Sequence, residues 1–296
     1  PLNLILSLNL RLQTLARQEL SGRKGAIVAI DPNTGFIKAL VSSPDYNPNI
    51  LNKTEIGSPY PEEKQVDSPF FNRAISGSYP PASTIKPFLG LLGLEERAID
   101  VETIIKDEGV FQINGEGRKY RGWKEEGHGE VNLHKAIVES SDVYFYELAS
   151  KLTIDKISGF LSLFNFGKNT GVDLNNESAS ILPDRNWKLG NIGEAWFVGD
   201  TVNMGIGQGY IAVTPIQLAS SVSAIATKGK IFKPKLVERL GDQDIEPELL
   251  FSIELNKKEN WETIEKSMIA VINSWNGTAH NLYKEGGLKI AGKTGT

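Results

Sequence analysis

Alternating and helical patterns of apolar residues divide the chain into distinct elements. Leucine occupies every even position from Leu2 to Leu12, which is typical of a strand, and residues 11–20 then follow a helical pattern. Two apolar runs, 25–30 and 36–41, flank the turn sequence 31–35, so we predict a β-hairpin there. Two adjacent apolar strands beside a helix indicate an antiparallel sheet with helices packed on it.

The clearest helix start follows a pair of prolines. Pro80-Pro81 disfavours helix immediately upstream, and Pro87, which cannot donate a backbone hydrogen bond, is tolerated only in a first helical turn. The helix must therefore begin near Ala82 or Ser83. The following run, Phe88–Leu94, is apolar on nearly every side, which predicts a helix buried in a core.

The rest of the pattern completes an α+β fold, with an antiparallel sheet flanked by helices and an all-helical lobe on one side. No repeat or low-complexity linker divides the chain, so we expect one domain over residues 1–296. We expect a loop over 42–72 and a polar surface segment over 98–132 with a strand candidate at 110–113. We expect helices over 133–152 (broken near 140–142), 154–168, 215–225 (capped by Thr214 and stopped by Gly229) and 261–275. The last expected element is a strand over 288–296.

Composition excludes several classes of function. A chain of 296 residues, 40% hydrophobic, is long enough for one large or two modest domains. The net charge of −4 does not show the basic excess that is typical of a nucleic-acid-binding protein. The absence of cysteine excludes disulfides, Cys-ligated zinc and a thiol nucleophile. No run of about 18 apolar residues is present, so no segment of this sequence is expected to span a membrane.

The two ends of the sequence suggest a fragment of a longer protein. The chain begins at Pro1 without a signal peptide and stops at Thr296 inside the strand predicted there. We expect a membrane anchor and an upstream domain before Pro1. We expect the strand that pairs with residues 293–296 to follow the end.

Ser83 and Lys86 are the first candidate catalytic residues. Residues three apart share one face of a helix, so the Ser83 hydroxyl and the Lys86 amine can meet at the start of the predicted buried helix. A serine nucleophile needs an adjacent base. The Ser-x-x-Lys pattern alone is weak, because Ser21 and Lys24 repeat it in a polar segment that reads as a loop. The assignment therefore depends on companion motifs.

Two companion motifs follow in the chain. Ser140-Ser141-Asp142 lies at the predicted helix break, and Lys293-Thr294-Gly295, which occurs once, lies near the end of the last predicted strand. Decoys for the second motif exist at residues 43–45 and 274–276. Ser-x-x-Lys, Ser-Asp-Asn and Lys-Thr-Gly in this order are the signature of penicillin-binding proteins and class A β-lactamases. The three elements found here agree with this set in order and in structural context, with Asp142 where the signature has asparagine.

Nearly the whole chain resembles the transpeptidase domain of class B penicillin-binding proteins. The run Tyr120–Gly129, together with Asp142 where many relatives have asparagine, is more similar to the elongation class, the penicillin-binding protein 2 group, than to the septal class. Other stretches similar to this family are Tyr79–Ser83, Asp200–Gly209, Thr214–Gln217 and Asn276–Ala279.

Acyl transfer is the chemistry that this resemblance implies, with Ser83 as the nucleophile. Lys86 serves as the base only when neutral, and both burial and the positive charge of Lys293 would lower its pKa. Ser140 would relay the proton between Lys86 and the leaving nitrogen. Asp142 would orient Lys86 or the substrate amide, and as an anion it would also favour charged Lys86.

The third motif would bind the substrate. By resemblance, the backbone N–H groups of Ser83 and Thr296 form the oxyanion hole. Lys293 with the hydroxyls of Thr294 and Thr296 would bind a carboxylate, and Gly295 would let a peptide lie against that strand. A carboxylate next to the scissile bond is what a D-Ala-D-Ala stem peptide offers. The implied reaction is peptidoglycan D,D-transpeptidation without a cofactor, and penicillin would acylate Ser83 as a mimic.

The resemblance also implies partners and a location. The expected ligands are peptidoglycan stem peptides and β-lactam antibiotics. The expected protein partners are a glycosyltransferase and proteins of the cell-elongation complex, in an enzyme that maintains cell shape. The expected location is the inner membrane with the catalytic domain on the periplasmic side, and membrane contact only through a segment absent from this sequence.

Two alternatives on the same scaffold remain. A β-lactamase or D,D-carboxypeptidase must deacylate with water, and a class A β-lactamase needs a glutamate to activate that water. Glu177 and Glu194 lie in predicted loops of the intervening region. A non-catalytic β-lactam sensor domain would acylate but only signal. The long segment before Ser83, with its hairpin, fits the transpeptidase better.

The remaining candidates have simpler interpretations. Gly205, Gly207 and Gly209 lack nucleotide-loop spacing and are expected to shape packing. Some relatives carry Asp, Asp, His and Cys as a zinc set. Here Asp107 and His128 match, whereas Gly122 and Ser141 do not, so we expect no metal. Ordinary roles are expected for His134 and His280 as hydrogen-bonded residues and for Trp123, Trp187, Trp196, Trp261 and Trp275 as core or cleft walls.

Overall fold

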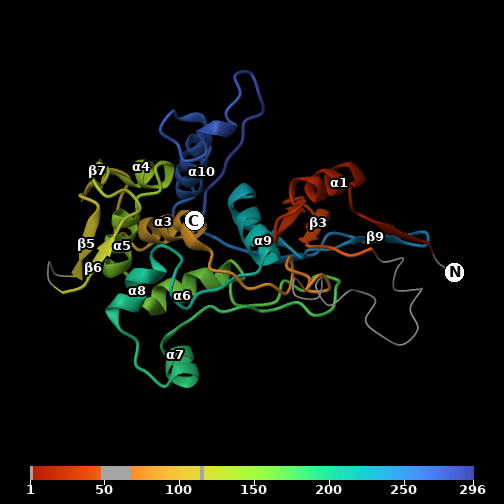
Figure 1. Cartoon of the computed structure of the whole chain (residues 1–296), viewed down its shortest axis with the longest axis horizontal. Coiled ribbons are helices and arrows are strands. Elements are labelled where there is room, and N and C mark those ends of the chain that lie inside the picture. Colours follow the sequence, from red (N-terminus) through yellow and green to blue (C-terminus); the bar gives the residue numbers. More distant parts are fainter. Residues whose placement is uncertain (1–2, 48–67, 114–116) are drawn as a thin grey trace. The chain divides into compact units, whose positions relative to one another are not determined.

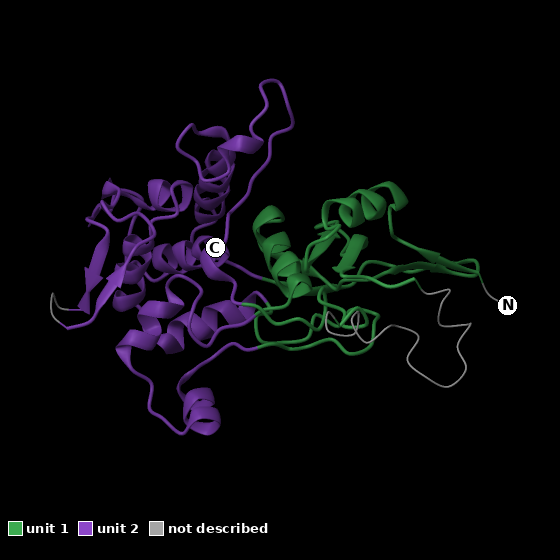
Figure 2. Ribbon diagram, in the orientation of Figure 1, with its two compact units in different colours: residues 1–79, 165–180, 213–252 green, residues 80–164, 181–212, 253–296 purple. Residues whose placement is uncertain are grey.

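The computed structural model describes residues 3–47, 68–113 and 117–296. These residues form two compact units, which Figure 2 distinguishes by colour. Within the described residues, no helix is long and apolar enough to cross a bilayer. The expected loop over 42–72 falls in part outside the described residues, as does Leu2. Unit 1 comprises residues 1–79, 165–180 and 213–252, and unit 2 comprises residues 80–164, 181–212 and 253–296.

Unit 1 contains the predicted hairpin. Strands β2 (Gly25–Ile30) and β3 (Ile37–Ser43) pair antiparallel, which confirms that prediction. Ile37, Ile75 and Ile216 belong to the buried core of this unit. The other elements of unit 1 are β1 (Leu4–Leu6), α1 (Leu10–Glu19), α9 (Pro215–Ala226), β8 (Lys230–Phe232), β9 (Val237–Leu240), β10 (Gln243–Asp244) and β11 (Leu249–Ser252).

Helices pack on the hairpin, with α1 against β3 and α9 against β2 (Figure 1). Strand β9 pairs with β1 and β10, and β8 pairs with β11, all antiparallel. Helix α9 begins as predicted: Thr214 and Gln217 form a reciprocal capping box, and Pro215 is the first helical residue.

The strand predicted over residues 2–12 is wrong beyond β1. Asn9 accepts hydrogen bonds from the backbone N–H groups of Arg11 and Leu12, at 3.1 Å each. This cap starts α1 at Leu10 despite the alternating leucines. A local hydrogen bond therefore overrides the period-two pattern.

Unit 2 is organised around one buried helix. A 3-10 turn, η2 (Ala82–Ile85), leads directly into α3 (Lys86–Glu95), with Pro87 in the first turn, so the predicted start is confirmed. The other elements of unit 2 are β4 (Ile105–Asp107), β5 (Val110–Gln112), β6 (Lys119–Arg121), β7 (Gly129–Val131), α4 (Leu133–Val138), α5 (Asp142–Lys151), α6 (Ile154–Leu163), α7 (Arg185–Ile192), α8 (Val198–Met204), α10 (Glu259–Asn273) and η4 (His280–Leu282).

Small residues let the neighbouring helices approach α3 closely. A Cβ added at Gly90 would lie 3.0 Å from Leu133 of α4, and one added at Gly93 would lie 2.9 Å from Leu148 of α5. Every residue from Lys86 to Leu94 is buried. The catalytic candidate Lys86 is thus carried on the central helix of its unit.

The break between α4 and α5 falls where the sequence predicted it. Asn132 caps α4 by accepting from the Lys135 N–H at 2.9 Å, and Ser141 caps α5 by accepting from the Tyr144 N–H at 3.2 Å. Between the two helices, Ser140 takes a left-handed φ of 58°. This conformation is uncommon for a non-glycine residue and marks a position that its surroundings hold in place.

Three other predictions need correction. Helix α6 ends at Leu163 rather than 168, because Asn165 takes a left-handed φ of 68° that a helix cannot continue. Residues 288–296 form no strand, since no strand pairs with them among the described residues. Trp275 is 84% exposed and is neither a core residue nor a cleft wall.

The glycines after α8 confirm their packing interpretation. Gly207 has a φ of 69°, and a Cβ added there would lie 2.2 Å from the carbonyl oxygen of Ala82. The Gly207 carbonyl in turn accepts a hydrogen bond from the Ala82 N–H at 3.0 Å. Backbone therefore packs directly on backbone beside Ser83, and only glycine leaves room for this contact.

Replacing Gly207→Ala should destabilise the protein by more than about 2 kcal/mol, because the new Cβ meets both an unfavourable φ and the Ala82 carbonyl. Chemical denaturation measures the free energy of unfolding. Gly159→Ala is the matched control. Gly159 lies inside α6, where an added Cβ meets nothing within 4 Å, so alanine should stabilise by about 0.5–1 kcal/mol. Equal effects of the two changes would contradict the packing argument.

Candidate active site

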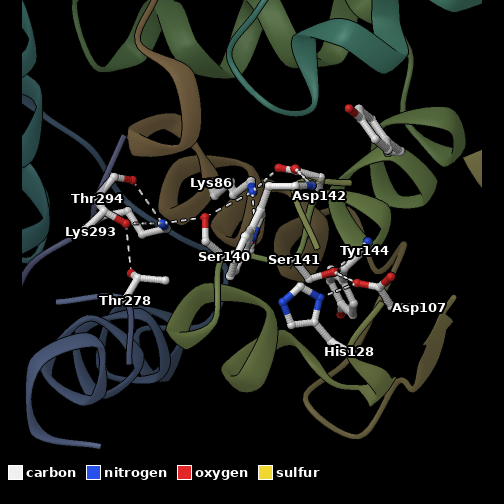
Figure 3. Close-up of polar contacts among 12 residues, drawn as sticks. Lys86, Asp107, His128, Ser140, Ser141, Asp142, Tyr144, Thr278, Lys293 and Thr294 are labelled. Carbon is white, nitrogen blue, oxygen red and sulfur yellow. Dashed lines mark hydrogen bonds and ion pairs between the residues drawn. The ribbon is translucent and has the colours of Figure 1, made fainter. Parts of the chain in front are cut away.

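Two lysine side chains meet at the hydroxyl of Ser140. Lys86 Nζ lies 3.2 Å from Ser140 Oγ, and Lys293 Nζ lies 2.8 Å from the same oxygen (Figure 3). Lys86 comes from the first residue of α3 and Lys293 from the segment after η4. A hydroxyl oxygen has two lone pairs, so with both lysines donating, the proton of Ser140 remains available for a third partner.

Lys86 is fully buried and uses all its donors on the second motif. Besides Ser140 Oγ, its Nζ donates to the Ser140 carbonyl at 2.9 Å and to Asp142 Oδ1 at 2.6 Å. Burial lowers the pKa of Lys86, because the interior disfavours the charged amine, while the charge and hydrogen bond of Asp142 oppose that shift. The balance between these two effects decides when Lys86 is neutral.

The pKa of the Lys293 amine lies near neutral pH. Burial is the first cause that lowers its pKa, to about 7, and the nearby charge of Lys86 adds to the effect, whereas Asp142 opposes it. The Lys293 amine also donates to the Thr294 carbonyl at 3.0 Å. The Thr294 hydroxyl lies 2.8 Å from that of Thr278, which fixes its orientation.

Ser140, Asp142 and Thr294 line one cleft of about 800 Å³, all of it within unit 2. Gly295 runs beside the turn that carries Ser83: a Cβ added at Gly295 would lie 3.0 Å from the Thr84 side chain and 3.3 Å from the Pro81 carbonyl. The residues that line the cleft are Ser83, Arg121, Gly122, Trp123, Ser140, Asp142, Tyr146, Ile206, Gln208, Thr278, Thr294, Gly295 and Thr296.

The sequence-predicted residues are therefore brought together, with one contact missing. Lys86, Ser140 and Lys293 form one hydrogen-bonded group, and Ser83 and Thr296 line the same cleft. Within the described residues, the Ser83 side chain makes no hydrogen bond, so the bond between nucleophile and base is not formed in this state. Such bonds commonly tighten only when substrate is present.

Comparison with known proteins places this geometry in a family. A family model for the penicillin-binding protein transpeptidase domain matches residues 25–296. The chain belongs to this family. The match spans more than nine-tenths of the chain and includes all three motifs, so the resemblance inferred from the sequence is confirmed.

Relatives of the elongation class are similar over nearly the whole chain. The peptidoglycan D,D-transpeptidase MrdA of Acinetobacter baumannii is 41% identical over 99% of this chain and 44% of its own length. Pseudomonas aeruginosa PBP2 in complex with WCK 5153 superposes with a TM-score of 0.90 at 37% identity, over 99% of this chain and 67% of that one. Helicobacter pylori PBP2 in a complex with MreC gives 0.88 at 34%, over 99% and 54%.

These likenesses confirm the predicted α+β fold and the likeness to the penicillin-binding protein 2 group. The chain spans about half the length of the curated relatives it matches.

A hydrogen-bonded cluster occupies the place of the zinc set considered for relatives of this penicillin-binding transpeptidase domain. Asp107 Oδ2 accepts from the Ser141 hydroxyl at 2.6 Å and lies 2.7 Å from His128 Nδ1 (Figure 3). Burial would raise the pKa of Asp107, but the hydrogen bonds from His128, Ser141 and the Gly109 N–H hold it below its usual value. One carboxylate and one imidazole do not supply the four ligands of structural zinc, so the residues present do not fit that metal.

Trp123 is the functional residue that the sequence interpretation underestimated. It lines the cleft, as predicted, but it also bonds the second motif twice. Its backbone N–H donates to Asp142 Oδ2 and its indole Nε1–H donates to the Ser140 carbonyl, both at 3.0 Å. Its place in the run 120–129, which carried the family likeness, was the one available signal.

The other candidates fall into ordinary roles. His134 lies 3.1 Å from the Ser267 hydroxyl, and His280 lies 3.1 Å from the Ile272 carbonyl, which confirms them as hydrogen-bonded residues. Glu177 lies in a loop of unit 1, where its carboxylate accepts hydrogen bonds from the backbone N–H groups of residues 170 and 171.

The Lys293 pKa predicts how stability depends on pH. The unfolded chain holds this proton up to about pH 10.5 and the folded chain only to about pH 7, so between these values the unfolded state binds more protons. Stability should therefore rise with pH across this window, with a contribution from Lys293 of up to about 1.4 kcal/mol per unit. Urea unfolding at pH 7, 8 and 9 measures the slope.

Two variants isolate the Lys293 contribution. Lys293→Met should flatten the slope, whereas Lys289→Met, at an exposed lysine of the same segment, should leave it unchanged. A slope that is the same in wild type and Lys293→Met would contradict the assignment.

Proposed function

We propose that this chain is the catalytic domain of a peptidoglycan D,D-transpeptidase that cross-links stem peptides during cell elongation and is acylated by β-lactams at Ser83. The observation that carries the proposal is the meeting of Lys86 and Lys293 at the Ser140 hydroxyl, in a cleft also lined by Ser83. The relatives named peptidoglycan D,D-transpeptidase support the same reaction.

Acylation begins with the Ser83 hydroxyl. Neutral Lys86 takes its proton, and the Ser83 oxygen forms a bond to the carbonyl carbon of the penultimate D-alanine. Ser140, whose oxygen already accepts from both lysines, donates its own proton toward the departing nitrogen and is reprotonated by Lys86. The C–N bond breaks, terminal D-alanine leaves as a neutral amine, and the acyl-enzyme remains. A second stem-peptide amine then attacks this ester, and Ser83 recovers its proton.

Binding and charge stabilisation belong to the third motif. The backbone N–H groups of Ser83 and Thr296 hold the developing oxyanion. Lys293 and the hydroxyls of Thr294 and Thr296 hold the substrate carboxylate by charge-assisted hydrogen bonds. A carboxylate raises the pKa of an adjacent lysine, so substrate binding keeps Lys293 charged although its pKa in the free protein is about 7. Gly295, without a side chain, lets the peptide backbone approach.

The whole protein would work at the cell surface with partners. The curated relatives are about twice as long as this chain, and in the proposed protein a membrane anchor and an upstream domain would hold this domain on the periplasmic side of the inner membrane. A glycosyltransferase would supply nascent strands to cross-link. The Helicobacter pylori PBP2 complex with MreC supports contact with elongation proteins.

A hydrolase on the same scaffold is less favoured. Within the described residues no glutamate lines the cleft, and its one carboxylate, Asp142, is bonded to Lys86. Neither Glu177 nor Glu194 lies in the cleft, and Glu194 is instead 60% exposed beside Lys188 at 3.6 Å. A class A β-lactamase needs a carboxylate that activates the deacylating water, so the penicilloyl adduct should persist for hours.

Fluorescent penicillin should label the protein at one residue, and Ser83→Ala should abolish that label. A gel read after minutes measures acylation, and a chase with unlabelled penicillin measures the lifetime of the adduct. Ser21→Ala, in the decoy Ser-x-x-Lys, is the matched control and should label like wild type. Labelling that survives Ser83→Ala would end the assignment, and loss of label within a second would favour a β-lactamase.

Acylation should become faster as pH rises and Lys86 loses its proton, and we call this rise the acid limb of the pH profile. Asp142→Asn should move the acid limb to lower pH. The carboxylate raises the pKa of Lys86, so removing its charge lets burial lower that pKa further. Neutral base is then present at lower pH, so acylation should begin to rise at a lower pH than in wild type. Acylation rates between pH 5 and 10 measure it. Asp155→Asn, in an exposed ion pair with Arg185, should leave the profile unchanged, and a limb that rises instead would contradict this account.

A further inference from the structure

Lys86 cannot act on Ser83 without giving up a hydrogen bond. A protonated lysine has three N–H donors, and here they serve Ser140 Oγ, the Ser140 carbonyl and Asp142 Oδ1. The neutral amine has two donors and one lone pair, and the lone pair must face the Ser83 hydroxyl to receive its proton. At least one of the three buried acceptors then loses its hydrogen bond from Lys86, and leaving that acceptor unpaired would be costly in a desolvated site.

Each of these acceptor groups has a second donor. Lys293 Nζ donates to Ser140 Oγ at 2.8 Å. The other two are served by one residue: the Trp123 indole N–H donates to the Ser140 carbonyl, and the Trp123 backbone N–H donates to Asp142 Oδ2, both at 3.0 Å. Trp123 and Lys86 thus share the same carbonyl and the same carboxylate.

Trp123 is itself held in place, although the residue is 61% exposed. It directly follows Gly122, whose N–H donates to the Gly109 carbonyl at 2.8 Å. Its ring packs edge-on against His128, with centroids 5.5 Å apart, and His128 is bonded to buried Asp107. These contacts therefore hold the indole so that its N–H points at the Ser140 carbonyl.

We propose that Trp123 is a positioning residue of the acyl-transfer site, whose two N–H groups hold the Ser140 carbonyl and the Asp142 carboxylate while Lys86 turns to Ser83. It keeps Ser140 in its left-handed conformation and keeps both acceptors paired in each protonation state of the base. This inference rests on the proposed function, because it assigns Lys86 the role of base.

The pH profile separates this role from a purely structural one. Without the indole N–H, the Ser140 carbonyl depends on Lys86 alone, which favours the three-donor, protonated amine. The Lys86 pKa should then rise, and the acid limb of acylation should move to higher pH by about half to one unit. The charged groups that face Lys86 stay the same in the variant: Asp142 from α5, Asp107 from β4 and Lys293 from the C-terminal segment.

The experiment replaces Trp123 in two ways. Trp123→Phe removes the donor and part of the ring, and incorporation of 3-benzothienylalanine at position 123 keeps the ring shape but replaces N–H by sulfur. Both variants should acylate with fluorescent penicillin about tenfold more slowly at pH 7, with the acid limb shifted upward and the melting temperature of the benzothienyl variant unchanged. Trp275→Phe, at the 84% exposed tryptophan of the same unit, should match wild type.

The outcomes distinguish this inference from the proposed function. A benzothienyl variant that acylates with the wild-type rate and pH profile overturns the role of the indole N–H, and so does a slower variant whose acid limb stays in place. Wild-type protein that takes up no label refutes the proposed function instead. An upward shift in the benzothienyl variant, which retains the fold, supports the inference even where Trp123→Phe loses stability.

Discussion

A buried ammonium group is the constraint on which the site depends. Lys86 lies at the centre of its unit with no exposed surface, and a charge in such a place must be paired and fully hydrogen-bonded. The second motif meets that need with a carbonyl, a hydroxyl and a carboxylate. The carbonyl is available only because the chain breaks between α4 and α5 and Ser140 adopts a left-handed backbone. The left-handed backbone of Ser140 therefore supplies a carbonyl that buried Lys86 needs as a hydrogen-bond acceptor.

Sharing one hydroxyl between two lysines also sets their charges. Two ammonium groups on one oxygen repel each other, and the protein resolves this unequally. Asp142 accepts a hydrogen bond from Lys86 and favours its charged form. Among the described residues no carboxylate pairs with Lys293, and burial lowers its pKa to about 7. A ligand carboxylate reverses the preference at Lys293. The charge that the proposed carboxylate binding needs is thus completed by the ligand.

Sequence reasoning succeeded where the controlling physics is local. Prolines fixed the start of the helix that carries Ser83, and Thr214 with Pro215 fixed the start of α9. It failed where the decisive partner is distant or side-chain direction matters. A strand over 288–296 needs a pairing strand, which a local pattern cannot reveal. The hydrogen bonds of Trp123 join it to residues 17 and 19 positions further along the chain, so only coordinates show that its indole faces Ser140.

The spacing of the motifs along the chain has a consequence for assembly during synthesis. Lys86 begins α3, and Ser140 lies 54 positions later between α4 and α5, which both contact α3, whereas Ser140 and Lys293 are 153 positions apart. Closing the longer loop costs more conformational entropy, and Lys293 leaves the ribosome after Lys86 and Ser140. A nascent chain can thus form the contact between Lys86 and Ser140 before Lys293 is available to complete the group. Under the proposed function, the part of the cleft that would bind the substrate carboxylate is therefore the last of the three motifs to join the site.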